Sequence, residues 1–523
     1  MDKNQIIDKY VPKNTKPEIF GNIIVYKIYS NNISRVICKL YHTDKLPLKT
    51  MAATDERKEN ESFKIFYVFG VPGENVFLVP YVLLFNEEKF PSLASTIHET
   101  AEYERKIKSF FGLTPTGHLN PRPLILHENW PDNLFPLRKD FNWQERPETA
   151  NTPYNFQKIE GEGIYEIPVG PVHAGIIEPG HFRFSVAGEE IVLLEPKLGY
   201  THKGSEKLFE ILPLNQKIRL SERISGDSSF SHSLAFCQAI ESLNDTEVPE
   251  ISKYLRVIYS ELERLANHFG DIGAMMLDTG FNFGGSHGSR LREIVMQWNE
   301  RLTGSRFLRG VNEIGGVSKD ISPQLKDELL EETRRLRKDF TEVIEIAEDS
   351  NSLLNRLEGT GVLDSQIAGD HGVIGIVGKA IGLKVDARMN YPYAAYDKFP
   401  FDIATEKDGD AYARFYVRVK EVYTSIKILQ EALKSKPSRS VLVSSKEISL
   451  KKHCYAIGIT EGWRGDIVYF VATDSQGNIS RVDVRDPSFL NWMVIGYAGQ
   501  GNVVPDFPLI NKSFNLSYSG FDV

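Results

Sequence analysis

The sequence contains few cysteines and no closely spaced cysteine pair. Only Cys38, Cys237 and Cys454 occur among 523 residues, and no two of them form a C-x-x-C motif. Disulfide frameworks and iron–sulfur clusters both need several cysteines at suitable spacings. The cysteine content therefore excludes a disulfide scaffold, is typical of a reducing compartment, and indicates that the chain does not bind an iron–sulfur cluster by itself.

Long hydrophobic runs and an excess of positive charge are also absent. The strongest apolar run, residues 76–85, is interrupted by Pro80 and is about half the length needed to cross roughly 30 Å of hydrocarbon. The first 17 residues are polar and lack the apolar segment of a secretory signal. With 62 Lys and Arg against 70 Asp and Glu, the net charge is −8, which argues against a nucleic-acid surface. We predict no export and no nucleic-acid partner, and any membrane association must depend on partner proteins.

The composition is that of a folded protein with more than one domain. Hydrophobic residues make up 41%, aromatic residues 11% and charged residues 25%, which argues against disorder. At about 150 residues per domain, the length predicts roughly two to four domains. We predict an α+β fold with a small N-terminal α+β domain at residues 1–145, a linker at 146–158 and a larger domain at 159–523.

The small domain is predicted to begin with a sheet and to continue with a helix. Two β-rich runs within residues 63–85 flank the turn-forming residues 72–75, which predicts a hairpin. Residues 91–111 then show helical spacing that ends at Gly112.

Long helical patterns dominate the larger domain. The clearest covers residues 249–276, a second begins at Ser322 and runs towards Gly359, and a third covers residues 409–434. Helices of this length usually pack together as a bundle. A short hairpin is predicted at residues 181–194.

Three segments carry residue types that are suited to chemistry. Residues 170–183 bring Glu178 and His181 to the start of the predicted hairpin, where they either relay protons or only satisfy backbone groups in a turn. Residues 222–232 open a helix that Asp227 or Ser228 would cap. Residues 485–491 have the composition of a turn.

The larger domain resembles a known family. Its matching stretches are GPVHAGIIEPGHFRF, LGYTHKGSEKLFE, ELERLANHFGDIGAMMLD, RLTGSRFLRGVNEIGGV and DARMNYPYAAYDKF. They are similar to the large subunit of membrane-bound nickel–iron hydrogenases and to the complex I subunit that lines the quinone cavity. EYERKIKSFFG, RPLILHENW and PLRKDF in the small domain resemble the neighbouring small complex I subunit. The fusion is similar to formate hydrogenlyase-type large subunits, and it implies a hydrogenase-large-subunit fold with a long-helix bundle and peripheral β-hairpins.

The sequence departs from this family at the metal ligands. Catalytic members bind nickel and iron through two cysteine pairs, in the motifs R-x-C-G-x-C-x-x-x-H and D-P-C-x-x-C. The surrounding motif residues match at Arg223, Gly226, His232, Asp486 and Pro487. The four cysteine positions hold Ser225, Ser228, Ser488 and Asn491. A nickel–iron centre needs soft thiolates, whereas hydroxyl and amide groups are neutral and hard, so we expect no metal in this chain.

The complex I resemblance also implies a quinone site. In that family a histidine and a tyrosine bind the quinone headgroup. His181 matches the histidine, and the tyrosine position falls on Gly226, which offers no donor. His181 and His232 are the expected cofactor-binding residues, and Arg223, Asp227, His232 and Asp278 are possible sources of the missing proton.

These observations predict a peripheral-arm subunit of a membrane-bound, energy-converting oxidoreductase complex. Electron arrival would be coupled to proton uptake in the vacated pocket, with Glu178, His181, Arg223 and Asp278 as catalytic residues. The resemblance implies two kinds of partner, a small subunit carrying a four-iron cluster and ion-translocating membrane subunits, at the cytoplasmic face of the membrane. Quinone is a possible cofactor. A quinone-reducing subunit and a structural subunit with a relic cavity are the alternatives.

Overall fold

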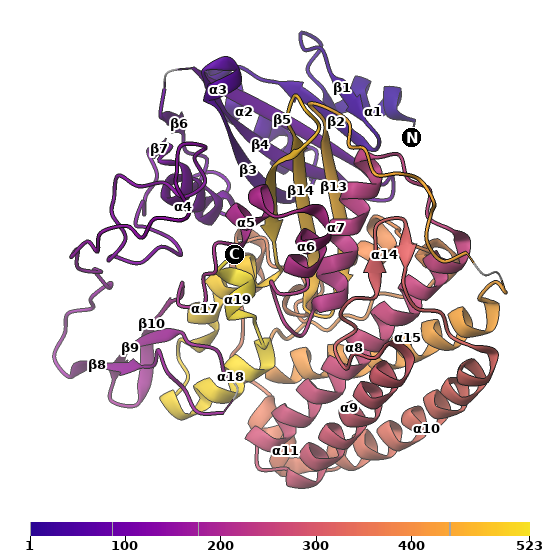
Figure 1. Ribbon diagram of the computed structural model, residues 1–523. Coiled ribbons are helices and arrows are strands. Elements are labelled where there is room, and N and C mark those ends of the chain that lie inside the picture. Colours follow the sequence, from indigo (N-terminus) through magenta and orange to yellow (C-terminus); the bar gives the residue numbers. More distant parts are fainter. Residues whose placement is uncertain (1, 86, 176, 439–440) are drawn as a thin grey trace.

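The computed structural model describes residues 2–85, 87–175, 177–438 and 441–523, and it confirms the predicted α+β class. An N-terminal sheet lies at the top in Figure 1, a central sheet lies below it, and long helices cover the opposite end. In the part of the chain that is described, no helix has the length and apolar character to span a bilayer.

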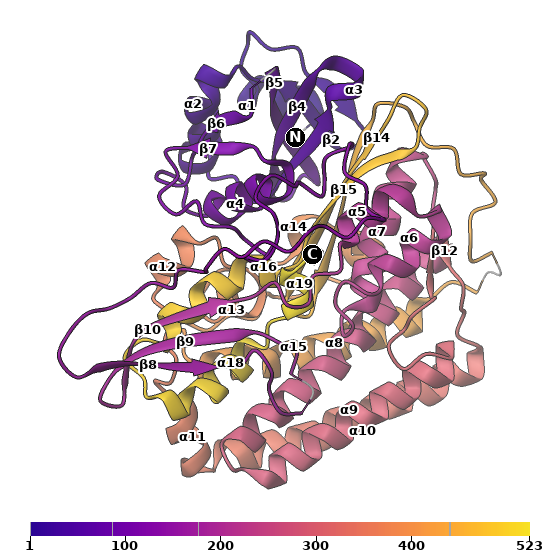
Figure 2. The same cartoon turned by 60° about the vertical axis from the view of Figure 1, so that its left-hand side comes forward.

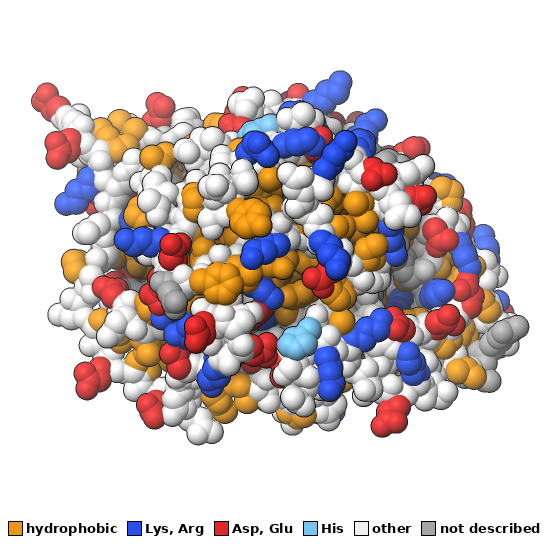
Figure 3. Space-filling model, turned by 90° about the horizontal axis from the view of Figure 1, so that it is seen from above, with side chains coloured by type: hydrophobic (Ala, Val, Ile, Leu, Met, Phe, Trp, Pro, Cys, Tyr) orange, Lys and Arg blue, Asp and Glu red, His pale blue; other side chains and the backbone are white. Residues whose placement is uncertain are grey.

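The N-terminal sheet has the strand order β1-β2-β5-β4-β3. The predicted hairpin is confirmed, because β4 and β5 pair in antiparallel register around residues 72–75. The strands are β1 (Glu18–Phe20), β2 (Ile23–Lys27), β3 (Leu48–Glu56), β4 (Ser62–Val71) and β5 (Val76–Phe85). The accompanying helices are α1 (Lys3–Tyr10), α2 (Ile33–Cys38), α3 (Arg57–Asn60) and α4 (Thr100–Phe111). Figure 3 views this end of the molecule and shows hydrophobic side chains near its centre, bordered by Lys and Arg.

The predicted helix at residues 91–111 begins later than expected. Residues 89–91 form β6 (Lys89–Pro91), which pairs with β7 (Thr114–Thr116), so α4 starts only at Thr100. Its predicted end is confirmed, because Gly112 has a φ of 73°, the left-handed conformation that glycine adopts readily. Residues 146–158, the predicted linker, form neither helix nor strand.

The larger domain opens with the predicted hairpin, which gains a third strand. β9 (His181–Ala187) pairs with β10 (Glu190–Lys197) and, on its other side, with β8 (Ile164–Val169). This three-stranded sheet lies at the edge of the molecule in Figure 2. Its position brings the segment before His181 towards the C-terminal helices.

Two of the three predicted long helices are confirmed, and the third is interrupted. α8 (Glu250–Asp278) and α15 (Ala411–Ser435) agree with the predicted patterns. α10 (Pro323–Glu348) starts as predicted, with the Ser322 side chain accepting a hydrogen bond from Leu325 N, but ends before α11 (Asn351–Leu357).

A further long helix, α9 (Asn282–Thr303), was not predicted because glycines occupy its first turns. Those glycines permit a close crossing with α8. A Cβ atom at Gly288 would lie 2.5 Å from the Cα atom of Gly273.

The central sheet, which was also not predicted, joins the two domains. It consists of β13 (Tyr455–Gly462), β14 (Gly465–Thr473) and β15 (Ile479–Arg485). One face packs on the N-terminal sheet, where the rings of Phe66 and Phe470 are 5.0 Å apart. The other face packs on α7 (Ser229–Leu243). Lys49 of β3 also forms a buried ion pair of 2.7 Å with Asp466 of β14.

Short helices and one small hairpin complete the fold. The helices are α5 (Ser205–Ile211), α6 (Leu214–Ser221), α12 (Ser365–Asp370), α13 (Gly375–Lys379), α14 (Ala387–Asn390), α16 (Ser488–Asn491), α17 (Ile495–Gly499), α18 (Phe507–Phe514) and α19 (Tyr518–Phe521). The hairpin is β11 (Asn312–Glu313) with β12 (Gly316–Val317). In Figure 1, α17, α18 and α19 lie between the β8–β10 sheet and α8.

We predict that Phe66→Ala destabilises both domains together. Phe66 is completely buried between the two sheets, so truncation should cost about 3–5 kcal/mol. Phe85→Ala is the matched control, because Phe85 is 52% exposed and its loss should cost about 0.5 kcal/mol. Urea denaturation followed by far-UV circular dichroism measures both. Equal shifts of the midpoint in the two variants would contradict a shared core.

Candidate active site

The loop before α7 is held by a carboxylate from α8. Ser228 is the N-cap residue, but its side chain accepts no capping bond from the described residues. Glu263 accepts hydrogen bonds from Phe230 N at 2.7 Å and Ser231 N at 3.1 Å instead. The predicted cap position at Ser228 is therefore confirmed, but the Glu263 carboxylate and not the Ser228 side chain accepts the first helical N–H groups. Burial raises the pKa of Glu263 to about 7.

Asp227 is paired with an arginine from the central sheet. Arg464, in the turn between β13 and β14, donates two hydrogen bonds of 2.7 Å to the two carboxylate oxygens. Trp463 Nε1 donates to the Asp227 carbonyl oxygen at 3.2 Å. Burial raises the pKa of Asp227, but the Arg464 guanidinium outweighs it and the net pKa is lowered. Arg464 is 6% exposed and the Asp227 side chain 34%, so one edge of the carboxylate meets solvent.

Ser517 connects the two segments that correspond to the metal-binding motifs, through a chain of serine hydroxyls to Ser225 and through its backbone N–H to Ser488. Ser225 Oγ lies 2.9 Å from Asp227 Oδ1 and 2.9 Å from Ser517 Oγ. Ser517 N donates to Ser488 Oγ at 2.9 Å, and Ser517 Oγ lies 3.3 Å from Ser519 Oγ. The C-terminal residues therefore fill the space between Ser225 and Ser488.

A buried histidine–carboxylate pair supports the second segment. His232 Nε2 lies 3.0 Å from Asp486 Oδ2, and His232 Nδ1 lies 3.0 Å from the Tyr469 hydroxyl. Asp486 Oδ1 accepts a hydrogen bond from Ser488 N at 2.7 Å. Gly520 packs directly on this carboxylate, since a Cβ atom there would lie 2.5 Å from Asp486 Cγ. His232 is thus engaged in structural contacts on both nitrogens.

The remaining two degenerate ligand positions are also satisfied by protein groups. Ser228 Oγ lies 3.4 Å from Asp227 Oδ1. Asn491 turns its amide to the backbone of Ile374, accepting from its N–H and donating to its carbonyl oxygen, both at 3.1 Å. Asn491 is therefore close in sequence to Ser488 but does not join the hydroxyl chain.

Glu178 contacts the C-terminal segment, and His181 is the first residue of β9. Glu178 Oε2 accepts a hydrogen bond from Ser519 N at 3.1 Å. His181 is 8% exposed, and its Nδ1 lies 3.4 Å from the Gly170 carbonyl oxygen. Its Nε2 is buried without a hydrogen-bond partner among the described residues. Burial lowers the pKa of His181, so the ring is held neutral.

Arg223 and Asp278 do not reach this cluster. Arg223 is exposed, and its Nη1 donates to the Arg219 carbonyl oxygen at 2.8 Å. Asp278 is exposed at the end of α8. It lies eleven residues, or about 16 Å of helix, beyond Asn267, whose side chain contacts the Asp227 carbonyl oxygen. Of the four predicted catalytic side chains, the structure thus shows only Glu178 in contact with the C-terminal segment, and His181 contacts Gly170 and the Phe156 ring instead.

A large cleft lies beside this cluster. It has a volume of about 980 Å³ and runs between α4, β10 and residues 118–135. Phe521 and Leu198 line it, whereas the hydroxyl chain does not. Within the described ranges, no group of three or more His, Cys, Asp or Glu side chains is arranged to hold a metal ion.

Comparison with known proteins identifies the family. Residues 278–456 match the respiratory-chain NADH dehydrogenase 49 Kd subunit, and residues 26–147 match the 30 Kd subunit. Formate hydrogenlyase subunit 5 of Escherichia coli K12 is 32% identical over 503 residues, covering 94% of this chain and 87% of the relative. Hydrogenase-4 component G of the same organism is 34% identical over 498 residues, covering 94% and 86%. The chain belongs to the family of these two subunits.

The structural comparison agrees with this family. One solved structure, described as the membrane-bound sulfane sulfur reductase, an archaeal respiratory membrane complex, superimposes with a TM-score of 0.65 and 26% identity. The match covers 69% of this chain and 99% of the other. The predicted relation to hydrogenase-type and NADH dehydrogenase-type subunits, fused in one chain, is confirmed.

The donors at the ligand positions do not fit the nickel–iron centre of this family's catalytic relatives. Three of the four positions carry hydroxyls that stay protonated at neutral pH, and the fourth carries a neutral amide. Ser225, Ser488 and Asn491 already make hydrogen bonds of 2.9–3.1 Å with protein groups. Neutral hydroxyl and amide oxygens are hard donors, and here they are already hydrogen-bonded. They therefore cannot replace the four thiolates that bind nickel and iron in such a centre.

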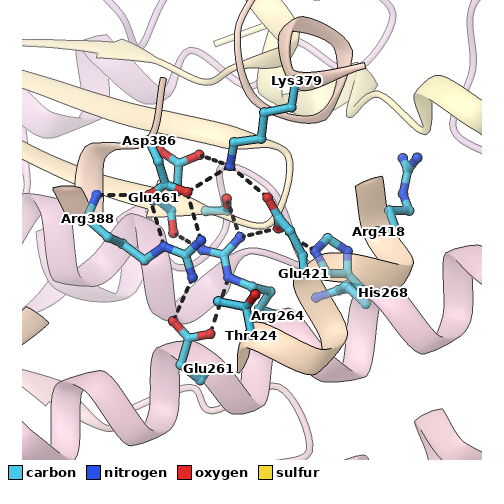
Figure 4. A network of polar contacts seen from close by, with 12 residues as sticks. Glu261, Arg264, His268, Lys379, Asp386, Arg388, Arg418, Glu421, Thr424 and Glu461 are labelled. Atoms are coloured by element: carbon cyan, nitrogen blue, oxygen red, sulfur yellow. Dashed lines mark hydrogen bonds and ion pairs between the residues drawn. The ribbon is translucent and has the colours of Figure 1, made fainter. Parts of the chain in front are cut away.

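A network of buried charges includes Glu461 near the end of β13 (Figure 4). Lys379 Nζ contacts three carboxylates, at 2.8 Å from Asp386, 2.7 Å from Glu421 and 3.4 Å from Glu461. Burial lowers the pKa of this lysine, but the three acids outweigh it and raise the pKa above its usual value. The contacts tie α13, α15 and β13 together.

Two arginines complete this network. Arg388 pairs with Asp386 at 2.7 Å and with Glu261 of α8 at 3.1 Å. Arg264 of α8 pairs with Glu421 at 3.2 Å and donates to the Glu461 carbonyl oxygen at 2.7 Å. The network therefore fixes the end of β13, and with it the turn that presents Arg464.

Sequence reasoning missed several residues of the site. Arg464, Ser517 and Glu263 come from segments far from the two motifs, so no local spacing points to them. The one local signal is at residues 462–465, where Trp463 and Arg464 stand between two glycines and between two apolar runs. That pattern is typical of a hairpin turn that presents a side chain.

We predict that Arg464→Met destabilises the protein by about 1–3 kcal/mol at pH 7. It leaves the partly exposed Asp227 carboxylate without its charged partner, and solvent offsets part of the loss. The double variant D227N/R464M should lose less, since no unpaired charge remains. Denaturation midpoints measure both.

The same pair predicts a pH dependence. Because the pKa of Asp227 is lowered in the folded protein, its contribution is present above the ordinary carboxyl pKa of about 4 and is lost as the pH falls through the folded pKa. The difference between wild type and Arg464→Met should therefore shrink between about pH 5 and pH 2. A difference that grows on acidification contradicts this assignment.

Proposed function

We propose that this subunit works without a nickel–iron centre in the peripheral arm of a membrane-bound, energy-converting oxidoreductase complex, where it couples electron transfer to proton movement. Its relatives include a formate hydrogenlyase subunit and a hydrogenase-4 component, which supports the complex. The proposed partners are an iron–sulfur small subunit, which would deliver the electrons, and ion-translocating membrane subunits at the cytoplasmic face.

The observation that carries this proposal is the bridging of the two degenerate motifs by Ser517. A hydroxyl both donates and accepts a hydrogen bond, so contiguous hydroxyls can pass a proton by switching their bonds. The relay runs from Asp227 through Ser225 and Ser517 to Ser519, with steps of 2.9, 2.9 and 3.3 Å. The three serines are at most 4% exposed, so bulk water does not bypass them.

A carboxylate stands at one end of this relay. Asp227 is one-third exposed there, whereas Glu178 accepts the backbone N–H of Ser519 and so positions that residue without exchanging a proton with its hydroxyl. Negative charge arriving beside the pocket raises the proton affinity of a nearby carboxylate. Asp227 then takes up a proton against the pull of Arg464 and releases it when the charge departs. Arg223 and Asp278 have no part in this relay.

We predict that Ser517→Ala slows proton uptake at least tenfold without changing the extent of reduction. The variant removes the one hydroxyl that connects Ser225 to Ser519. The measurement uses the purified native complex, reduced by a stoichiometric low-potential viologen, with a pH indicator recording proton uptake. Ser229→Ala is the control, because Ser229 is a buried hydroxyl of the same loop that donates to the Gly226 carbonyl oxygen and lies outside the relay.

Unchanged proton uptake in Ser517→Ala, together with normal assembly of the complex, would contradict the proposed proton relay. The subunit would then be structural, with a relic pocket. Stoichiometric nickel in the purified complex, assigned to this chain, would separately overturn the absence of a metal centre.

Quinone binding is a second candidate, favoured by His181. Its Nε2 is buried, unpartnered among the described residues and neutral, which suits a contact with a ligand. The expected second donor is missing, since the nearest atom to a Cβ at Gly226 is Arg309 Nη2, at 3.5 Å, and no tyrosine lies there. When bound, a quinone would supply two-electron, two-proton chemistry, with His181 orienting one oxygen.

We predict that His181→Ala weakens binding of a short-chain quinone analogue about tenfold, the loss of one hydrogen bond. Fluorescence or competition titration on the purified complex measures the dissociation constant. His173→Ala is the matched control, because His173 Nε2 is already engaged with the Gly180 carbonyl oxygen at 2.7 Å. Equal affinities in wild type and His181→Ala exclude a headgroup site at this histidine.

A further inference from the structure

A second cleft lies on another part of the molecule, and neither the relay nor the family relation accounts for it. It has a volume of about 870 Å³ and runs between the end of β3, α5 and α6, and the β14–β15 hairpin. Lysines are prominent in its wall at the helical end. They are Lys139, Lys207 and Lys217.

Lys217 has a buried side chain that forms no ion pair with the described residues. Its side chain lies in α6, is 6% exposed and lines the cleft. It makes no ion pair and no side-chain hydrogen bond with the residues that the structure describes. A buried ammonium group normally acquires a partner, because its desolvation is otherwise uncompensated. An unpaired charge that lines a cleft therefore indicates a ligand from outside the chain.

The neighbouring charges increase the positive excess. Glu210 Oε2 is shared by Lys139 Nζ at 2.9 Å and Lys207 Nζ at 3.4 Å. Glu210 Oε1 has no partner in the described chain. Two lysines thus contact one carboxylate, Lys217 lines the same cleft, and these four side chains together carry a charge of about +2 when all are ionised.

Several other charges of the cleft are paired within the chain, and the acids Glu18, Glu59 and Asp474 also line it. Lys64 pairs with Glu56 at 2.8 Å, and Arg481 pairs with Glu206 at 2.9 Å. Asp55 is paired with Arg57 at 2.7 Å. None of these three pairs involves Lys139, Lys207 or Lys217.

We propose that the lysine end of this cleft binds a small phosphate-type dianion, either inorganic phosphate or the phosphoryl group of an ester. A phosphate monoester carries about −1.5 to −2 charges at pH 7, which matches the local excess, whereas a single carboxylate leaves part of it unpaired. Lysine is an effective phosphate ligand because its ammonium acts as a point charge. Phe141 and Trp143 line the same cleft and offer apolar surface to the remainder of an ester.

The test uses the full-length chain and inorganic phosphate as the probe. Isothermal titration should show saturable binding to wild type, at least tenfold weaker binding to Lys217→Met and partial recovery in Lys217→Arg. Lys58→Met is the matched control, because Lys58 is an exposed lysine of the same cleft near Glu59 and should bind like wild type. All variants are compared at the same phosphate concentration, so that the general effect of phosphate on protein stability is the same in each.

A second readout separates loss of the site from loss of the fold. Burial lowers the pKa of Lys217 to about 8, although Glu210 acts in the opposite direction, so part of it is a free amine at pH 8. Mass spectrometry should show acylation of Lys217 that phosphate suppresses at least fivefold, with labelling of Lys58 unchanged. Without phosphate, Lys217→Met should melt at or above the wild-type temperature, because the unpaired charge is gone.

Three results would overturn the proposal. One is phosphate binding of equal strength in wild type and Lys217→Met. Another is succinate binding as tight as phosphate, which would assign the lysines to carboxylates, such as those of an acidic partner segment. The last is a marked fall in the melting temperature of phosphate-free Lys217→Met, which would make the lysine a structural group.

Discussion

The ion pair between Arg464 and Asp227 is the constraint on which the rest of the site depends. It joins the turn of the central sheet to the loop before α7 through two hydrogen bonds of 2.7 Å. With that loop fixed, Ser225 faces Ser517 and the C-terminal segment closes over Ser488. Where a catalytic relative uses metal–thiolate bonds to hold its two motifs together, this chain uses one charged pair and a row of hydroxyls.

The buried charges around Lys379 provide the rigidity that this arrangement needs. Replacing such charges by apolar side chains often raises stability, so their presence argues for geometric precision rather than for strength. Here they connect α8, α13, α15 and β13, which all converge on the Arg464 turn. Asp386 and Arg388 belong to one of the stretches that carried the family resemblance, and the structure shows that both side chains are buried in this network.

The sequence predicts the elements that have one buried face, and it fails where burial is continuous. α8 and α15 show a clear helical period because one side faces the core. β13 to β15 are buried on both faces between α7 and the N-terminal sheet, which removes the alternation that identifies a strand. In the site, the motif residues Ser225 and Ser488 were identified by comparison with a known pattern. Ser517 and Arg464 were not, because their roles arise only from contacts distant in sequence.

The shared core of the two domains bears on how such proteins assemble. Phe66 and Phe470 meet in a completely buried contact, and the buried pair of Lys49 and Asp466 also joins the two sheets. As separate chains, the halves would have to find each other before either could cover its apolar face. Covalent tethering converts that encounter into an intramolecular event at an effective concentration in the millimolar range. Fusion thereby sets a one-to-one ratio of the halves and makes their union independent of how much of each is synthesised.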